Sequence, residues 1–487
     1  MLSKKICCFL IAIPFFASAQ NEPTPEQAEA VNTFFNGYNA RDYTEMRKPM
    51  SSVIKLAFSK GMLEKVYGAA YSIFGKARVI SIKKSPSGAS ILADISYEKD
   101  STETQRMGFM LNNKNKFVGL SNPSLKFHYP LANAAGLTEL QMYARIDSIV
   151  QQKYKAGVFT GCVLVMDKGK VIYKNCAGNA DYENKTPLND SSLFELASLS
   201  KQFTAMAIMI LAEQGKLHYI DDMLQYIPEL PYSGITIENL LTHTSGLPDY
   251  EEMLDKYWDR KKFAGNDDVV SSFAKYKPAV DFKPGKKHEY SNTGYVMLSV
   301  IIEKVSGMSY ADFLSKYIFQ PLGMTHSRVY NTRRVKNERI TNYAYGYVYS
   351  DSLKKYIIPD LLPDNDYVIY QDAITGDGTV NSSVTDLALW EKGLRENRLV
   401  SKISLDKAFT KVKLSSGTQE DYGYGWSIQA DENFERIAHH SGSWPGYTSY
   451  DVHFMDTEKA VFILSNNEYI NVARFANKLC LVLTAKN

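Results

Sequence analysis

Serines that stand three residues before a lysine are the chain's candidate nucleophiles. A lysine amine one helical turn from a serine hydroxyl can take its proton and make the serine nucleophilic. This Ser-x-x-Lys spacing occurs seven times in the sequence, at Ser52, Ser81, Ser96, Ser198, Ser272, Ser352 and Ser404. The spacing alone therefore does not identify a nucleophile.

Ser198 differs from the other six serines in the segment that follows it. Residues 203–212 are almost uniformly apolar, and Gly215 follows, a residue type common just beyond a helix C-terminus. This pattern predicts a helix buried on all sides, whose N-terminus directs N–H groups and a partial positive charge at Ser198. We therefore expect Ser198 to be the nucleophile and Lys201 to be its base.

Other chemistries have no support in the sequence. It contains no His-Glu-x-x-His, Cys-x-x-Cys or Gly-x-x-x-x-Gly-Lys motif, so we expect no metal and no cofactor. The formal net charge is only +3 over 487 residues, which provides no basic excess for binding nucleic acid. The sequence indicates no particular protein partner.

Three motifs in chain order resemble those of the serine β-lactamase and penicillin-binding protein superfamily. Residues 194–201 (Phe-Glu-Leu-Ala-Ser-Leu-Ser-Lys) resemble the first motif, and Tyr290-Ser291-Asn292 resembles the second, Tyr-x-Asn. His440-Ser441-Gly442 stands where the third motif falls, on a late strand. Further family-like segments are 240–248, 321–325 and 424–426. The similarity covers about 350 residues and is closest to class C β-lactamases and their esterase and peptidase relatives.

The resemblance implies a role for each matching residue in the first two motifs. Ser198 attacks an acyl carbon and Lys201 accepts its proton. Tyr290 exchanges a proton with the leaving group. Asn292 holds Lys201 and the substrate amide by hydrogen bonds.

The third motif departs from the Lys-Thr-Gly of class C β-lactamases. His440, Ser441 and Gly442 resemble the esterase and D-amino-acid peptidase branches instead. The resemblance implies a catalytic role for His440, substrate binding by Ser441, Gly442 and Ser443, and an oxyanion hole formed by the N–H groups of Ser443 and Ser198. A histidine with a pKa of about 6.5 is mostly neutral near pH 7.5. We therefore expect weak binding of carboxylates such as penicillins, and activity that depends on pH around the titration of His440.

Some polar residues near these motifs are predicted to stay outside the site. His243 is expected to brace a loop, and His439 to point to the opposite face of the strand that carries His440. Residues 251–262 carry both charge signs and predict a solvated helical face beside the cleft.

Cys162 and Cys176 lie on two alternating segments that predict a hairpin with a two-residue turn at Lys168-Gly169. In the regular register Cys162 faces Asn175, so the two sulfurs point to opposite faces. We therefore predict no disulfide between them. A single bulge in the hairpin would reverse this prediction.

The beginning of the chain predicts export. Lys4 and Lys5, the apolar run 6–16 and the small residues 17–19 are typical of a signal peptide, which we place at 1–19. The apolar run is shorter than the roughly 20 residues that span a bilayer, so no stable membrane anchor is expected after cleavage. The mature protein is expected in the periplasm or outside the cell.

The elements that must position the motifs predict an α+β fold. Residues 137–487 open with a helix at 140–154 and a strand hairpin, and close with several strands and a final helix at 472–485. Strands near both ends with helices between them predict one antiparallel sheet flanked by helices. Residues 22–125, with helical periodicity first and alternating strands afterwards, predict a small α+β accessory domain. Its layout resembles the SnoaL-like cone fold. Residues 126–136 are expected to be a linker.

Three functions remain open at this point. The first is a secreted serine hydrolase that forms an acyl-enzyme on Ser198 and cleaves amide or ester bonds of small peptide or ester substrates. The second is a β-lactamase. The third is a penicillin- or peptidoglycan-binding or sensor protein without turnover.

Overall fold

The computed structural model describes residues 22–85, 88–121, 137–330, 340–350, 352–430 and 435–485. The chain forms two compact units, Met1–Leu125 and Lys126–Asn487, which we describe separately. The predicted signal peptide and the predicted linker at 126–136 lie outside the described residues.

The first unit consists of helices followed by an antiparallel meander. The helices are α1 (Pro25–Ala40), α2 (Tyr43–Arg47), α3 (Ser52–Ala57) and α4 (Lys60–Phe74), and the strands are β1 (Ala77–Lys84), β2 (Ser90–Tyr97), β3 (Asp100–Leu111) and β4 (Phe117–Ser121), paired in that order. Phe34 of α1 packs edge-on against Phe109 of β3 and Phe117 of β4, which joins the helices to the sheet. The unit is α+β, and its resemblance to a cone fold stays a prediction.

The second unit is organised around a six-stranded antiparallel sheet. Its order is β16 (Ser427–Gln429), β17 (Ile437–Trp444), β18 (Tyr447–Phe454), β19 (Lys459–Ser465), β5 (Gly161–Asp167) and β6 (Lys170–Ala177). The early strand β5 pairs with the late strand β19, so the predicted meeting of the two ends of this unit in one sheet is confirmed.

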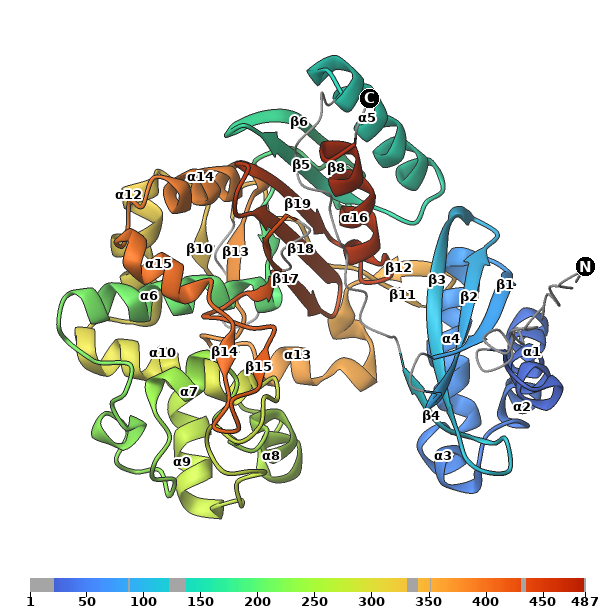
Figure 1. Ribbon diagram of the computed structural model, residues 1–487, viewed down its shortest axis with the longest axis horizontal. Helices are drawn as coiled ribbons and strands as arrows, with labels where there is room; N and C mark the ends of the chain where they lie inside the picture. The colour runs from blue at the N-terminus through green and yellow to red at the C-terminus, as the bar shows by residue number, and fades with distance from the viewer. Residues whose placement is uncertain are drawn as a thin grey trace, which may run out of the picture. The chain divides into compact units, whose positions relative to one another are not determined.

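Helices cover both faces of this sheet (Figure 1). Val163 and Val461 belong to one apolar cluster, with α5 (Glu139–Lys155) and α16 (Val472–Leu483). Leu164 and Phe462, their neighbours along the strands, belong to the other, with α6 (Lys201–Glu213) and α14 (Val384–Arg395). This alternation follows from the two-residue period of strands. The fold is therefore the predicted antiparallel sheet flanked by helices.

The remaining elements lie between β6 and β16 along the chain. The helices are α7 (Ile237–Leu241), α8 (Tyr250–Tyr257), α9 (Asn266–Tyr276), α10 (Asn292–Ser306), α11 (Tyr310–Leu314), α12 (Gln320–Leu322), α13 (Tyr367–Tyr370) and α15 (Lys402–Ala408). The short strands are β7 (Asn179–Asp181), β8 (Thr186–Pro187), β9 (Phe194–Glu195), β10 (Arg328–Val329), β11 (Val348–Ser350), β12 (Lys355–Ile357), β13 (Val380–Ser382), β14 (Val412–Lys413) and β15 (Gln419–Glu420). Helix α6 is buried along residues 201–211, which confirms the predicted buried helix after Ser198.

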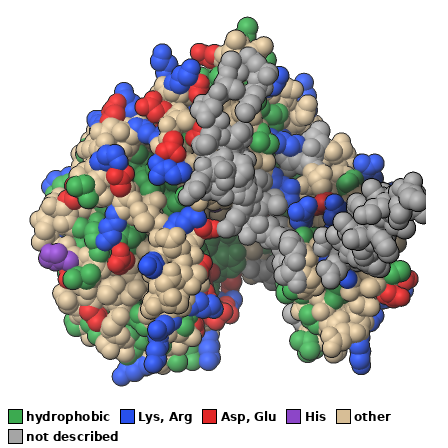
Figure 2. Space-filling view, in the orientation of Figure 1, with side chains coloured by type: hydrophobic (Ala, Val, Ile, Leu, Met, Phe, Trp, Pro, Cys, Tyr) green, Lys and Arg blue, Asp and Glu red, His purple; other side chains and the backbone are tan. Residues whose placement is uncertain are grey.

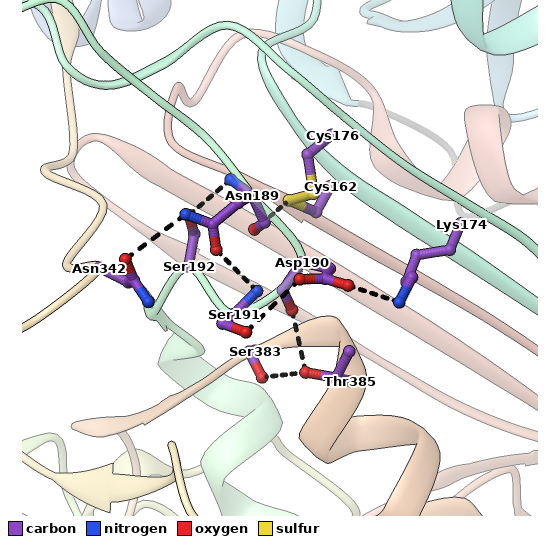
Figure 3. The surroundings of a disulfide bond; sticks show 10 residues. All are labelled: Cys162, Lys174, Cys176, Asn189, Asp190, Ser191, Ser192, Asn342, Ser383 and Thr385. Carbon is purple, nitrogen blue, oxygen red and sulfur yellow. Dashed lines mark hydrogen bonds and ion pairs between the residues drawn. A yellow bond between two sulfur atoms is a disulfide. The ribbon is translucent and has the colours of Figure 1, made fainter.

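The hairpin of β5 and β6 corrects the prediction about its cysteines. Asp167 faces Lys170, but the register shifts between Val165 and Met166, so that Cys162 faces Cys176 and not Asn175. The two Cα atoms are 4.1 Å apart and the sulfurs form a disulfide (Figure 3). The prediction of no disulfide is wrong, because a bulge moves one strand by one residue and brings both side chains to the same face.

The surface matches the nearly balanced charge of the chain. On the face shown in Figure 2, the basic side chains and the acidic side chains are interspersed. Among the described helices, none combines the length and the apolar composition needed to cross a bilayer.

Candidate active site

Ser198 lies in a short 3₁₀ turn, η1 (Ala197–Ser200), directly before α6. Lys201 is fully buried, and its Nζ lies 3.0 Å from Ser198 Oγ. The same Nζ donates to Asn292 Oδ1 at 2.9 Å and to the backbone oxygen of Asp377 at 2.8 Å. Two carbonyl oxygens therefore hold the amine in place, and the third contact of Nζ is with the hydroxyl of Ser198.

The turn that carries Ser198 is held by the neighbouring sheet strands. Ala197 has φ 49°, a left-handed conformation that is costly for a residue with a Cβ. Ser449 Oγ of β18 donates to the carbonyl oxygen of Leu196 at 2.7 Å. A Cβ on Gly442 of β17 would lie 2.1 Å from that oxygen, so only glycine allows β17 to approach this closely. The packing of the sheet against the turn supports the strained backbone beside the nucleophile.

The second motif lies at the start of α10. Ser291 caps the helix, with Oγ accepting from the N–H of Gly294 at 3.1 Å. This cap places Asn292 at the first turn, where it contacts Lys201. Tyr290 is 45% exposed, and Lys201 Nζ lies 4.9 Å from the centre of its ring. The structure therefore brings Ser198, Lys201, Tyr290 and Asn292 together.

His243 braces the segment that carries Tyr290. Its Nδ1 accepts from the N–H of Ser291 at 3.0 Å, and its ring packs 4.2 Å from that of Tyr290. The side chain is fully buried, and Nε2 has no hydrogen-bond partner among the described residues. Burial, and then the charge of Lys201, hold the pKa of His243 well below its usual value. His243 thus braces a loop in its neutral form, as expected. The loop that it braces carries Tyr290, a candidate catalytic residue.

His440 is buried in β17, and its side chain is engaged on both ring nitrogens. Nε2 lies 2.9 Å from Tyr422 Oη, and Nδ1 lies 2.7 Å from the backbone oxygen of Ser441. Its ring centre is 6.0 Å from that of Tyr290. Burial, and then the charge of Lys201, lower the pKa of His440 to about 4. The expectation of a titration near pH 6.5 is therefore wrong for this residue, because burial opposes the charged form.

The other residues of the third motif alternate along β17. Gly442 is buried against the nucleophile turn, whereas Ser441 and Ser443 are exposed. Ser443 lines the same cavity as Ser198 and Asn292. Of Ser441, Gly442 and Ser443, the three residues expected to bind substrate, Ser443 is therefore the one that lines the cavity.

The cavity has a volume of about 560 Å³ and opens above Ser198. Its walls come from α8, α13, the loop around Asp377 and the end of β17. Aromatic side chains line it as well, among them Tyr367 and Trp444. A space of this size accommodates a small peptide or ester.

Two carboxylates beside Lys201 were missed by the sequence analysis. Glu251 was placed on a solvated face, but it is half-buried, and its Oε1 accepts from Asn292 Nδ2 at 3.1 Å. Asp377 is buried, and Tyr250 Oη donates to its Oδ2 at 3.0 Å. Burial and the nearby charge of Asp377 raise the pKa of Glu251 to about 7, and burial raises the pKa of Asp377 as well. We call Ser198, Lys201, Asn292, Glu251 and Asp377 the nucleophile cluster.

A second buried polar group lies between β18 and α14, and we call it the ion network. It consists of Asp451, His453, Glu391 and Arg395. His453 lies 3.1 Å from Asp451 and 2.5 Å from Glu391, and Arg395 Nε donates to Glu391 at 2.7 Å. Burial alone would lower the pKa of His453, but the two carboxylates raise it to about 9. Burial would likewise raise the pKa values of Glu391 and Asp451, but His453 holds both below their usual values.

The chain matches a protein-family model and is similar in sequence to penicillin-binding proteins. A model of the β-lactamase family matches residues 146–485. Penicillin-binding protein 4* of Bacillus subtilis (strain 168) is 47% identical over 310 residues, which cover 64% of this chain and 68% of that protein.

Solved structures agree with the sequence match. A penicillin-binding protein homologue from Pyrococcus abyssi, described as octameric, has a TM-score of 0.59 and 28% identity, covering 71% of this chain and 78% of its own. A D-amino acid amidase from Ochrobactrum anthropi SV3 has a TM-score of 0.58 and 24% identity, covering 70% and 98%. The second likeness concerns the fold alone.

Proposed function

The chain belongs to the β-lactamase family, and on that premise we propose that it is a secreted serine hydrolase that forms an acyl-enzyme on Ser198 and cleaves amide or ester bonds in small substrates. The observation that carries the proposal is the set of contacts around Lys201 Nζ, which lies 3.0 Å from Ser198 Oγ while two carbonyl oxygens hold it in place.

The hydrogen bonds of Lys201 support a role as base. The side-chain oxygen of Asn292 and the backbone oxygen of Asp377 can only accept. For Lys201 to act as the base, its amine must first give up one proton. The two oxygens then hold its two remaining N–H groups, and its lone pair faces the hydroxyl of Ser198, 3.0 Å away. As the proton of that hydroxyl moves to Nζ, Oγ forms a bond to the acyl carbon.

The remaining steps use the other motif residues. The N–H groups of Ser198 and Ser443 receive the developing oxyanion, an interaction typically worth a few kcal/mol. Tyr290 passes a proton to the leaving nitrogen or oxygen as its bond to the acyl carbon breaks. Water then attacks the acyl carbon and gives a proton to Tyr290, which replaces the proton that Tyr290 gave to the leaving group. The bond between the acyl carbon and Ser198 Oγ breaks, and Oγ takes back its proton from Lys201.

Secretion is supported by two independent features. The residues at 1–19 have the composition of a signal peptide. The disulfide between Cys162 and Cys176 is the kind of bond that persists in oxidising compartments such as the periplasm or the cell exterior.

The proposal is tested by labelling with a neutral fluorophosphonate, with Ser198→Ala and Ser404→Ala compared to the wild type. Ser404 also precedes a lysine by three residues, so it is the matched control. We expect Ser198→Ala to abolish labelling and ester hydrolysis, and Ser404→Ala to retain both. Labelling that survives in Ser198→Ala contradicts the proposal.

The same preparation separates the alternatives. Efficient penicillin hydrolysis with no preference for a p-nitrophenyl ester would identify a β-lactamase. Stoichiometric labelling without turnover of any ester or amide would identify a binding or sensor protein.

A further inference from the structure

Asp377 contacts Lys201 with its backbone, and its carboxylate has no role in the steps described above. The backbone oxygen accepts from Lys201 Nζ at 2.8 Å, and the carboxylate accepts from Tyr250 Oη at 3.0 Å. The residue is buried and also lines the cavity above Ser198. Burial of an ionisable group is costly, so a buried carboxylate beside a base is a candidate for control of that base.

The loop that carries Asp377 is held in place by two helices. Thr204 Oγ1 of α6 donates to the backbone oxygen of Gly376 at 2.5 Å, and Ser299 Oγ of α10 donates to that of Thr375 at 3.0 Å. Gly376 has φ 104°, and a Cβ there would lie 2.3 Å from the backbone oxygen of Tyr295, so this close approach requires glycine. The position of the loop, and with it the backbone oxygen that Lys201 contacts, therefore does not depend on the side chain of Asp377.

The ionisable groups around Asp377 come from several elements. They are Lys201 of α6, Tyr250 and Glu251 of α8, Asp249 before α8, and Tyr310 of α11. Burial raises the pKa of Asp377, whereas Lys201 and Tyr250 favour its charged form. The charge of Asp377 in turn raises the pKa of Glu251. The carboxylate is thus coupled both to the amine and to the second carboxylate of the nucleophile cluster.

The other groups that face Lys201 bring no further negative charge. Burial lowers the pKa values of His243 and His440, so both are neutral near pH 7. The rings of Tyr290 and Tyr295 have their centres 4.9 Å and 5.6 Å from Lys201 Nζ.

We propose that Asp377 is a positioning residue that also sets the pH range in which Lys201 can act as a base. Its backbone oxygen directs the amine towards Ser198, and its carboxylate, held by Tyr250, opposes loss of the proton that the amine must give up. A negative charge favours the protonated form of a neighbouring group. The proposal rests on the proposed serine hydrolase function and concerns control of the same site by pH.

The test measures the second-order rate constant for labelling of Ser198 by a neutral fluorophosphonate as a function of pH. Asp377→Asn keeps the backbone oxygen, nearly the same shape and an acceptor for Tyr250, but removes the charge. We expect the acid limb, the pH range over which labelling increases, to move to lower pH by about 1 pH unit or more, the effect of one nearby opposite charge. Glu251 acts in the same direction, because its pKa also falls when the charge of Asp377 is removed.

Three further variants separate the charge from a merely structural role. Asp377→Glu keeps the charge, so its acid limb should stay near that of the wild type even where the longer side chain lowers the rate. Tyr250→Phe should move the acid limb to lower pH by a smaller amount, because Tyr250 favours the charged form of Asp377. Asp312→Asn is the control, because Asp312 also accepts a hydroxyl hydrogen bond, from Ser309, but does not line the cavity.

The outcomes distinguish this proposal from the hydrolase function. Failure of Ser198 to label at any pH overturns the hydrolase function. Normal labelling with an acid limb that stays in place in Asp377→Asn, or in Tyr250→Phe should the first variant not fold, overturns the control by Asp377. A lower rate constant at every pH with an unmoved acid limb assigns Asp377 a structural role only and also contradicts the proposal.

Discussion

The nucleophile cluster and the ion network are two buried polar groups of the same unit. Their surroundings favour the neutral form of the carboxylates in the first group and the charged form of the side chains in the second. In the ion network, opposite charges are paired, so the pKa values of Glu391 and Asp451 are lowered and that of His453 is raised to about 9. In the nucleophile cluster, burial prevails and the pKa of Glu251 is raised to about 7. The first group is fully ionised near neutral pH, and the second is poised to exchange protons.

The two groups are expected to affect different properties of the protein. Removing one partner of a buried ion pair lowers the free energy of unfolding, because the other charge stays buried without its partner. Groups whose ionisation is disfavoured by their surroundings are characteristic of sites that bind or react. We therefore expect substitutions in the ion network to change mainly the free energy of unfolding, and substitutions in the nucleophile cluster to change mainly rates.

The largest expected effect is that of Lys201→Ala. Loss of the base should lower kcat/KM for a p-nitrophenyl ester by about 10²- to 10⁴-fold, because general base catalysis typically contributes that much. Urea denaturation should show a folded protein that loses less stability than the ion-network variant described next. A variant that hydrolyses the ester at the wild-type rate would remove Lys201 from the mechanism.

The next effect is a loss of stability in His453→Ala. Removing His453 takes the paired cation from the buried Asp451 and leaves Glu391 with Arg395 alone, and breaking a buried pair in this way typically costs about 3–5 kcal/mol. Lys402→Ala is the control, because it breaks an exposed pair with Asp406 and should change the unfolding free energy by at most about 0.5 kcal/mol. Equal unfolding free energies for the two variants would show that the network does not stabilise the fold.

The pH dependence of that loss sharpens the comparison. Since His453 has a raised pKa, its contribution is fully present below about pH 6.5 and is lost as pH rises through about 9. The contributions of Glu391 and Asp451, whose pKa values are lowered, are lost instead as pH falls below their usual range near 4. The difference between wild type and His453→Ala should therefore shrink from pH 6 to pH 9.5 in urea denaturation. A constant difference would mean that His453 is not charged in the folded protein.

The smallest effects are expected at His243, which joins a hydrogen bond and a ring contact in one side chain. His243→Asn keeps an acceptor for the N–H of Ser291 and tolerates the observed φ of 56°, but removes the ring beneath Tyr290, so kcat should fall about tenfold with stability nearly unchanged. His243→Phe keeps the ring but leaves that N–H unpaired, which should cost about 1–3 kcal/mol of stability.

Steady-state kinetics and urea denaturation of both His243 variants check this prediction. We expect the loss of kcat mainly in His243→Asn and the loss of stability mainly in His243→Phe. A loss of stability and of kcat together in both would show that His243 only fills space.

The parts of the site that could be predicted from sequence are those encoded locally. The spacing of Ser198 and Lys201 and the apolar helix after them lie within one segment, and Tyr290 and Asn292 form a short motif. Glu251 could not be predicted, because its contact with Asn292 depends on how α8 packs beside α10. A signal was present in the density of charge at 251–262, but a solvated helix gives the same pattern.

The disulfide and the ion network show why sequence patterns fail over longer distances. One bulge between Val165 and Met166 changes which residues face each other, and nothing in the alternation of the hairpin marks it. Glu391 and His453 lie on a helix and a strand that meet only in the folded unit. The antiparallel sheet itself could be predicted, because its strands have clear alternating patterns at both ends of the unit.

The pairing of β5 with β19 also has a consequence for the order in which the protein can fold. Gly161 faces Ser465, so the centre of the sheet cannot form until nearly the whole unit has been synthesised. Closing so long a loop is entropically costly and slows folding. Until β19 arrives, β5 presents an unpaired edge that is prone to aggregation. Expression at low temperature, or with a holding chaperone, should therefore raise the yield of folded protein more than any substitution at the active site.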